Sequence, residues 1–221
     1  MEQLARSNLS DQIYNIISKQ IIRNELKPGE LIYETQISKD WGVSRSPVRD
    51  ALHMLEKIRL VERTPKGGYR VTELSIDFIE HFYETVNIVY QYAFAKTAEK
   101  ATPENLDEFK NALEQLETSI EKKDFDQYLN IVTEMAYRIL EIAGNPLVER
   151  IARELMPTAE RIQWASITYL PDRLKTVINH LRHAYDSIAN NDHDGAAKAF
   201  ENFAATQVEV VINSIRDEKK I

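Results

Sequence analysis

WGVSRSPVRDAL, residues 41–52, is the segment that decides the fold of this chain. Apolar residues recur at helical spacing on either side of Gly42, which predicts two short helices that meet at a tight turn. These residues are Ile37, Trp41, Val43, Val48, Leu52 and Leu55. Ser44 is expected to cap the second helix through its hydroxyl. Pro47 is tolerated in the first turn because the N–H groups there lack intrahelical partners. The segment therefore predicts a helix-turn-helix.

The first turn of the second helix carries candidate DNA-contacting side chains. Arg45, Ser46 and Arg49 fall on the side of this helix that is predicted to be exposed. A guanidinium group donates two parallel hydrogen bonds to a guanine edge or to a phosphate, and a serine hydroxyl bonds with either. The alternative interpretation is a set of solvated surface charges. Their position beside the turn favours DNA contact in the major groove.

A hairpin follows the helix-turn-helix. Residues 60–63 and 69–72 predict two short strands, joined by the loop TPKGG at residues 64–68. Gly67 and Gly68 supply the positive φ of a tight turn, and glycine also lets the backbone approach a phosphate closely. The fold class is therefore mostly α: an N-terminal winged helix-turn-helix with a small β-hairpin wing, followed by an all-α bundle. The candidate DNA-binding residues are Ser44, Arg45, Ser46, Pro47, Arg49, Lys66, Gly67 and Gly68.

Three separated motifs resemble those of the GntR family of bacterial transcription regulators. They are KPGEL at residues 27–31, the segment at residues 41–52 and KGGYRV at residues 66–71, in the order and spacing of the family. The resemblance implies that Ser44, Arg45, Ser46 and Arg49 contact the groove and that Lys66 and Gly67 lie at the wing tip. In some relatives an arginine near the position of Thr35 also contacts DNA, and this chain lacks it.

The remainder of the chain predicts an antiparallel helical bundle. No part of residues 75–221 alternates like a strand, and cap residues or prolines divide this part into six helices. The dividing residues are Ser75, Thr102, Pro103, Gly144, Pro146, Pro171 and either Asp192 or Asp194, and Pro157 is expected to kink the fourth of these helices. An earlier helix is expected over residues 9–26. The predicted domains are a winged helix at 1–72, a linker at 73–76 and a helical effector-binding and dimerisation domain at 77–221.

Composition excludes several classes of protein. The chain has no cysteine, which excludes disulfides, zinc–thiolate sites and thiol catalysis. It has no apolar run long enough to cross a membrane and no export signal, so a cytoplasmic location without membrane contact is expected. The net charge is −7, but residues 1–72 hold 12 Lys and Arg against 9 Asp and Glu, whereas the rest hold 16 against 26. The basic excess therefore coincides with the predicted DNA-binding domain.

The second half resembles the effector domain of the FadR branch of the same family, the all-helical FCD type. AGNPL at residues 143–147 and the alanine-rich segment after Asp192 carry this resemblance. Many FCD domains hold a divalent metal with one aspartate and three histidines, but the corresponding positions here are all apolar, as is the position of a common arginine, Val86. The four ligand positions are Val132, Ala136, Leu181 and Phe203. Alkyl and phenyl groups cannot ligate a metal, so no metal and no cofactor is expected.

Two further interpretations of the helical half stay open. His180 and His183 stand three residues apart and could chelate a metal together with Asp192, His193 and Asp194, although periodicity favours surface histidines. The apolar interior is either an effector pocket for a lipophilic or acyl-type small molecule or a ligand-free core. The candidate pocket residues are Val86, Tyr90, Val132, Ala136, Tyr137, Leu181 and Phe203.

These patterns predict a homodimeric repressor that binds a palindromic double-stranded DNA operator and responds to a small-molecule effector. One alternative is an architectural DNA-binding dimer without an effector. A second is a metal-dependent enzyme built on the helical domain. The chain shows no paired carboxylates, no nucleophile with its base and no phosphate loop at useful spacing, so an enzyme is not expected.

Overall fold

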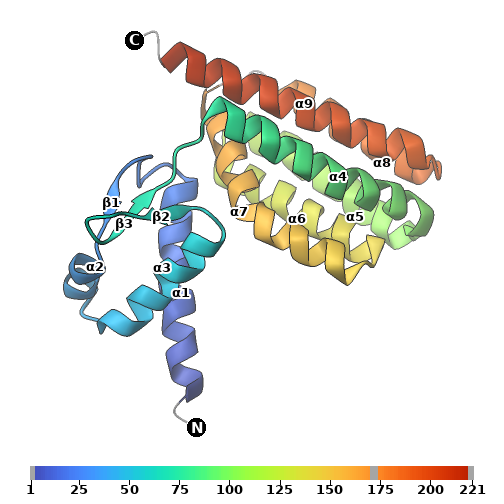
Figure 1. Cartoon of the computed structure of the whole chain (residues 1–221). Helices are drawn as coiled ribbons and strands as arrows, with labels where there is room; N and C mark the ends of the chain where they lie inside the picture. Colours follow the sequence, from blue (N-terminus) through green and yellow to red (C-terminus); the bar gives the residue numbers. More distant parts are fainter. Residues whose placement is uncertain (1–2, 170–173, 219–221) are drawn as a thin grey trace. The chain divides into compact units, whose positions relative to one another are not determined.

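The computed structural model describes residues 3–169 and 174–218 and divides into two units. The first unit comprises Met1–Leu74 with Pro157–Arg161, and the second comprises Ser75–Met156 with Ile162–Ile221. Figure 1 shows the order of the elements along the chain. The fold is mostly helical with one small sheet, which confirms the predicted fold class.

The first unit is a winged helix. Its helices are α1 (Gln3–Ile22), α2 (Glu34–Trp41) and α3 (Arg45–Lys57), and its strands are β1 (Leu31–Ile32), β2 (Val61–Arg63) and β3 (Tyr69–Val71). The strands form an antiparallel sheet in the order β1-β3-β2, in which Leu31 faces Arg70 and Val61 faces Val71. The predicted helix-turn-helix and hairpin are present. Strand β1 was not predicted, and α1 spans Gln3–Ile22 instead of residues 9–26.

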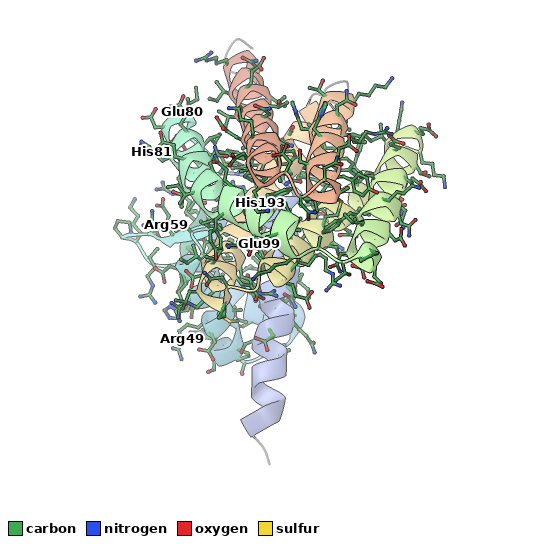
Figure 2. The ribbon with its side chains drawn as sticks, turned by 90° about the vertical axis from the view of Figure 1, so that its right-hand side faces the viewer. Arg49, Arg59, Glu80, His81, Glu99 and His193 are labelled. Atoms are coloured by element: carbon green, nitrogen blue, oxygen red, sulfur yellow. The ribbon has the colours of Figure 1, made fainter. Side chains whose placement is uncertain are left out.

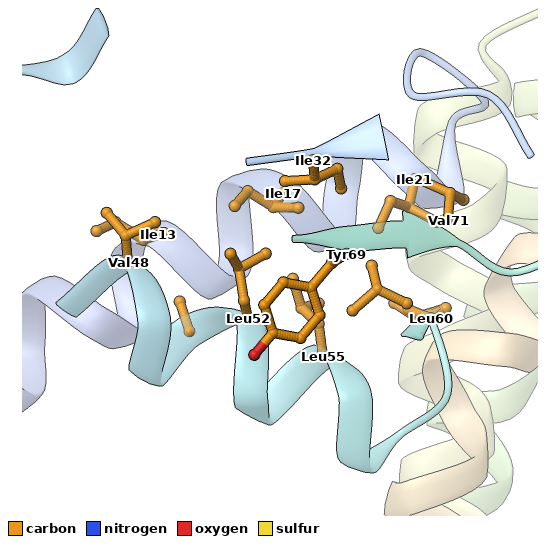
Figure 3. Packing of buried hydrophobic residues seen from close by; sticks show 12 residues of the cluster. Ile13, Ile17, Ile21, Ile32, Val48, Leu52, Leu55, Leu60, Tyr69 and Val71 are labelled. Carbon is orange, nitrogen blue, oxygen red and sulfur yellow. The ribbon is translucent and has the colours of Figure 1, made fainter. Parts of the chain in front are cut away.

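An apolar cluster packs together the helices and the sheet of the first unit (Figure 3). Isoleucines one turn apart on α1 meet the inner face of α3 and the inner side of the sheet. The members exposed by 2% or less are Ile13, Ile17, Ile21, Val48, Ala51, Leu52, Leu55, Leu60, Val61, Tyr69 and Val71. Burying one such aliphatic side chain stabilises a fold by about 1.5–3 kcal/mol, so α3 is fixed along its whole inner face.

The second unit is a helical bundle within its described residues. Its helices are α4 (Ile76–Lys100), α5 (Pro103–Glu121), α6 (Phe125–Ala143), α7 (Pro146–Tyr169), α8 (Leu174–Ala189) and α9 (His193–Glu218), except that Pro157–Arg161 of α7 belongs to the first unit. Helix α4 packs against α6, α8 and α9, while α5 packs against α6 and α8. None of the described helices is long and apolar enough to cross a membrane.

Most predicted helix boundaries of this unit are set by their caps. The Ser75 hydroxyl accepts a hydrogen bond from the Phe78 N–H at 3.1 Å, and Thr102 forms a reciprocal capping box with Asn105. Gly144 ends α6 with a left-handed φ of 68°. Pro157 lies inside α7. The predicted start of a helix at Pro171 lies outside the described residues.

Candidate nucleic-acid interface

Helix α3 has one buried face and one exposed face. Val48, Ala51, Leu52 and Leu55 are fully buried. Arg45, Ser46 and Arg49 are exposed at the start of the helix, and Figure 2 shows the Arg49 side chain among those that project from it. The buried residues fix the rotation of α3, so the arginines are presented to solvent with little backbone freedom.

Ser44 occupies the N-cap position of α3, with extended backbone angles of φ −68° and ψ 158°. Its side chain makes no capping hydrogen bond, so the expectation that its hydroxyl caps the helix is wrong. Ser44 adopts the extended backbone angles of an N-cap residue although its hydroxyl does not cap the helix. Pro47 is the third residue of α3 and is tolerated there, because the N–H groups of a first turn have no intrahelical acceptor. The start of α3 can therefore receive an anion, such as a phosphate, on its N–H groups.

The guanidinium groups of Arg45 and Arg49 are not neutralised inside this structure. Across residues 3–169 and 174–218, neither side chain has an ion pair or a side-chain hydrogen bond. Arg70 differs, because its Nε lies 3.0 Å from Glu62 Oε1 on the neighbouring strand. The guanidinium N–H groups of Arg45 and Arg49 are therefore available to donate hydrogen bonds to another molecule.

The wing tip is a tight, internally bonded loop. Thr64 Oγ1 donates to the Gly67 carbonyl at 2.7 Å, and the Gly67 N–H donates to the Thr64 carbonyl at 3.1 Å. Gly67 and Gly68 have φ values of 87° and 84°, as the prediction of positive φ requires. Lys66 is exposed between these bonds. The loop thus presents one cation on a short, rigid turn.

Gly68 is also held by a neighbour. A Cβ placed on Gly68 would lie 2.8 Å from Tyr33 Cδ1 and 3.0 Å from the Ile32 carbonyl oxygen, whereas a Cβ on Gly67 would meet nothing within 4 Å. Tyr33 therefore packs over the base of the wing, at a distance that only glycine permits. The two glycines therefore differ in their surroundings. A side chain at Gly68 would clash with Tyr33 and the Ile32 carbonyl, whereas a side chain at Gly67 would meet no neighbouring atom.

A group of polar contacts around Arg63, which the sequence did not predict, joins the wing to α3. Arg63 Nη2 lies 2.9 Å from His53 Nε2 and 3.3 Å from the Tyr69 hydroxyl, and its Nε lies 3.5 Å from Glu56. The hydrogen bond to Tyr69 is the main cause that raises the pKa of Arg63. These contacts join β2 to the C-terminal half of α3. Residues ten positions apart on different elements leave no periodic signal that could have predicted them.

The candidate pocket residues fall into two groups. Val132 and Leu181 belong to one apolar cluster, and Tyr90 and Phe203 both contact the Phe200 ring, at centroid distances of 5.1 and 5.7 Å. The other three residues are Val86, Ala136 and Tyr137. Val86 is buried and Ala136 is half-buried, and Tyr137 is half-buried beneath the Arg153 guanidinium, which lies 4.7 Å from its ring centroid. All seven lie in the second unit.

The histidines of α8 have different surroundings. His180 is half-buried, and its Nε2 lies 3.1 Å from Thr206 Oγ1 on α9, while His183 is exposed. Burial, with a smaller effect of His183, lowers the pKa of His180. Among the described residues, no group of three or more His, Asp or Glu side chains is placed to hold a metal ion.

Comparison with known families decides the assignment. Residues 81–205, more than half of the chain, match the FCD domain, and residues 9–71 match the family described as bacterial regulatory proteins, gntR family. The chain belongs to the GntR family. It combines the GntR helix-turn-helix domain with an FCD domain at its C-terminal side, which confirms the resemblance seen in the motifs.

Similar GntR proteins are transcription regulators. The repressor RspR of Escherichia coli K12 is 21% identical over 210 residues, which cover 95% of this chain and 91% of RspR. YdhC of Bacillus subtilis strain 168, an HTH-type transcriptional regulator, is 36% identical over 109 residues, and this match spans 49% of each chain. The solved structure of E. coli McbR/YncC aligns with a TM-score of 0.81 at 20% identity and covers 94% of this chain and 98% of that chain. This last likeness shows the fold.

The family assignment sets the broad function. GntR proteins are transcription regulators that bind DNA, typically as dimers, and they are not enzymes. The enzyme alternative is thereby removed. The exposed Arg45 and Arg49, Lys66 at the wing tip and the N-terminus of α3 are the candidates for such binding in this GntR chain.

Proposed function

We propose that this chain is a sequence-specific repressor that binds a palindromic double-stranded operator as a homodimer. The observation that carries the proposal is the rigid outward display of Arg45 and Arg49 on a helix whose other face is fully buried. A major groove admits such a helix, and a bidentate guanidinium contact with guanine discriminates against other bases by about 1–3 kcal/mol.

Each candidate residue has a distinct role in this proposal. Arg45 and Arg49 read base edges, and Ser44 and Ser46 bond with phosphates beside the groove. In the wing, Lys66 adds a point charge near the backbone, while Gly67 and Gly68 let the loop approach it. The phosphate contacts set the position of α3, and the arginines supply the sequence preference.

Dimer formation follows from the size of one half-site. A single recognition helix reads only a few base pairs, so one copy gains modest affinity. Joining two copies makes the second binding event intramolecular, which strengthens binding by roughly 10²–10⁴-fold. A two-fold symmetric protein requires a palindromic site, with half-sites about one helical turn apart or a multiple of it.

A fluorescence anisotropy titration tests this proposal. A labelled duplex carrying the operator palindrome is compared with a scrambled duplex and with a single half-site, over a series of salt concentrations. We expect the palindrome to bind most tightly and its affinity to fall steeply with salt. Equal affinity for the palindrome and the scrambled duplex would show that binding is not sequence-specific.

Repression is the proposed direction of regulation, and the name of RspR as a repressor supports it. A regulator of bacterial genes acts where the chromosome lies, so a cytoplasmic location is part of the proposal. A reporter gene placed behind the operator should be expressed more strongly when this gene is deleted. Weaker expression after deletion would indicate an activator.

The FCD unit is proposed to bind a lipophilic or acyl-type effector without a metal. Apolar residues stand at all four positions where family members place metal ligands, which favours an apolar ligand over a metal-bound carboxylate. Two measurements test this part. A metabolite library that includes acyl compounds should contain a ligand that raises Tm, because a ligand that binds the folded state stabilises it. Zinc and nickel titrations should show no tight uptake, and stoichiometric uptake would contradict the metal-free proposal.

A further inference from the structure

One turn of α7 is a packed part of the first unit. Residues Pro157–Arg161 cluster with Met1–Leu74, although α7 begins and ends in the second unit. Arg161 in this turn is only 5% exposed. Burial, with a smaller contribution from the charge of Glu160, raises the pKa of Tyr14 on α1, which packs against the apolar cluster of this unit. The winged helix of this chain is therefore completed by a turn that lies far along the sequence.

Arg161 holds Thr72 with two hydrogen bonds. Its Nη1 donates to the Thr72 hydroxyl oxygen at 3.1 Å, and its Nη2 donates to the Thr72 carbonyl oxygen at 2.7 Å. The N–H groups of a guanidinium project from one rigid plane, so two of them engage both the side chain and the backbone of one residue in a single orientation. Thr72 follows the last residue of β3, and its position is therefore set by a side chain of α7.

Thr72 in turn joins α3, β2 and β3. Its hydroxyl donates to the Arg59 carbonyl at 2.8 Å, and its backbone N–H donates to the Leu60 carbonyl at 3.1 Å. Arg59 and Leu60 belong to the connection between α3 and β2. Arg59 also has a left-handed φ of 59°, a conformation that a non-glycine residue keeps only where its surroundings hold it. A chain of hydrogen bonds therefore runs from Arg161 through Thr72 to the end of α3.

Arg161 does not have the partners of an arginine that serves stability. Burial lowers its pKa to about 10, and no carboxylate among the described residues forms an ion pair with it. A buried cation costs free energy that an apolar side chain of similar size avoids, and hydrogen bonds to neutral groups offset only part of that cost. A methionine would occupy similar space without this cost. The guanidinium instead supplies the geometry that it imposes on Thr72.

We propose that Arg161 is a positioning residue for DNA binding. Through Thr72 it sets the place where α3 ends and the wing begins, and with it the angle at which α3 and the wing meet the duplex. Arg161 is buried, so its side chain is not available to contact DNA directly. This inference rests on the proposed operator binding and adds a residue away from the DNA surface on which that binding depends.

Two substitutions at Arg161 separate geometry from charge. Arg161→Met removes the cation at similar volume, and Arg161→Lys keeps the cation but loses the planar group that makes both hydrogen bonds. In anisotropy titrations both full-length variants should bind the palindrome with a dissociation constant raised roughly tenfold. Arg182→Met is the matched control: it makes the same change at an exposed arginine of α8 and should bind as the wild type does. Wild-type affinity of either Arg161 variant would overturn the positioning role.

The scrambled duplex distinguishes positioning from a general loss of binding. Arg161→Met leaves the exposed cations Arg45, Arg49 and Lys66 in place, so its affinity for the scrambled duplex should stay within a few fold of the wild type. The ratio of the two affinities should therefore fall. An equal loss on both duplexes would contradict the proposal, because a positioning residue alters the specific fit and not the general attraction to phosphates.

Hydrogen–deuterium exchange measures the positioning without DNA. In Arg161→Met the amides of residues 59–72 should exchange faster than in the wild type, because Thr72 loses the side chain that holds it, while the amides of α5 should be unaffected. Unchanged exchange over residues 59–72 would show that Thr72 keeps its place without Arg161 and would overturn the proposal. If Arg161→Met loses helical circular dichroism, Thr72→Val is measured in its place, since it removes only the hydroxyl shared by Arg161 and Arg59.

The same measurements distinguish a failure of this inference from a failure of the proposed function. If the wild type binds the palindrome and the scrambled duplex equally, the proposed function fails, and the exchange of residues 59–72 still decides whether Arg161 fixes Thr72. If the wild type discriminates between the duplexes and Arg161→Met does so equally well, only the role of Arg161 fails.

Discussion

Replacing Arg49 with alanine should abolish specific operator binding without affecting stability. Arg49 is exposed and has no described side-chain partner, so its removal should change the free energy of unfolding by no more than about 0.5 kcal/mol. A bidentate contact with guanine contributes about 1–3 kcal/mol, and a dimer on a palindrome makes it twice. The expected loss is therefore about 2–6 kcal/mol, or roughly 30-fold to 2 × 10⁴-fold in the operator dissociation constant.

Fluorescence anisotropy at fixed salt measures this loss, and thermal unfolding followed by circular dichroism measures stability. Arg70→Ala is the matched control, because it removes the same charge from the same unit but from a guanidinium already paired with Glu62. We expect the control to bind the operator within a few fold of the wild type. Normal operator affinity of Arg49→Ala would refute the role given to this residue, and an equal loss in both variants would show that only net charge matters.

Three other substitutions test the wing and one helix cap. Lys66→Ala should lower the salt slope of operator binding by about one for each wing that contacts a phosphate, measured as log affinity against log salt; an unchanged slope would remove Lys66 from the interface. Gly68→Ala should lower the free energy of unfolding by ~1–3 kcal/mol more than Gly67→Ala in chemical denaturation. Both have positive φ, but only a Cβ added at Gly68 would lie 2.8 Å from Tyr33 Cδ1; equal losses would contradict this packing. Thr102→Ala should cost about 1 kcal/mol in the same assay, and no change would show that the capping box is dispensable.

Much of the fold could be predicted because its signals are local. Apolar spacing predicted the two helices around Gly42, and hydroxyl caps at Ser75 and Thr102 predicted where long helices begin. Gly67 and Gly68 predicted a tight hairpin, and both have the positive φ that it needs. Each of these features depends on residues within one turn of one another.

The missed features depend on contacts between distant residues or on very short elements. Strand β1 has two residues, too few to show an alternating pattern, and it forms only because β3 offers a pairing edge. The hydrogen bond between Arg63 and His53 joins β2 to α3, which are separate in sequence. Ser44 occupies the predicted cap position, but the orientation of its hydroxyl depends on surroundings that its neighbours in sequence do not specify.

For the candidate site, the sequence could predict which side chains are exposed on α3 but not what they bind. Residue type and helical phase placed Arg45 and Arg49 on an outer face, and the structure has them exposed. Their contact with DNA, the composition of the effector pocket and the absence of a metal stay predictions, since each concerns a partner that one chain does not specify.

Selection of bound duplexes from a random DNA pool tests sequence-specific readout by α3 most directly. Wild-type protein should enrich an inverted repeat with at least one guanine at a fixed position in each half-site, and Arg49→Ala should lose the preference at a fixed position in both halves together. Enrichment of no common sequence by the wild type, or an identical repeat from both proteins, would contradict the reading of bases by Arg49.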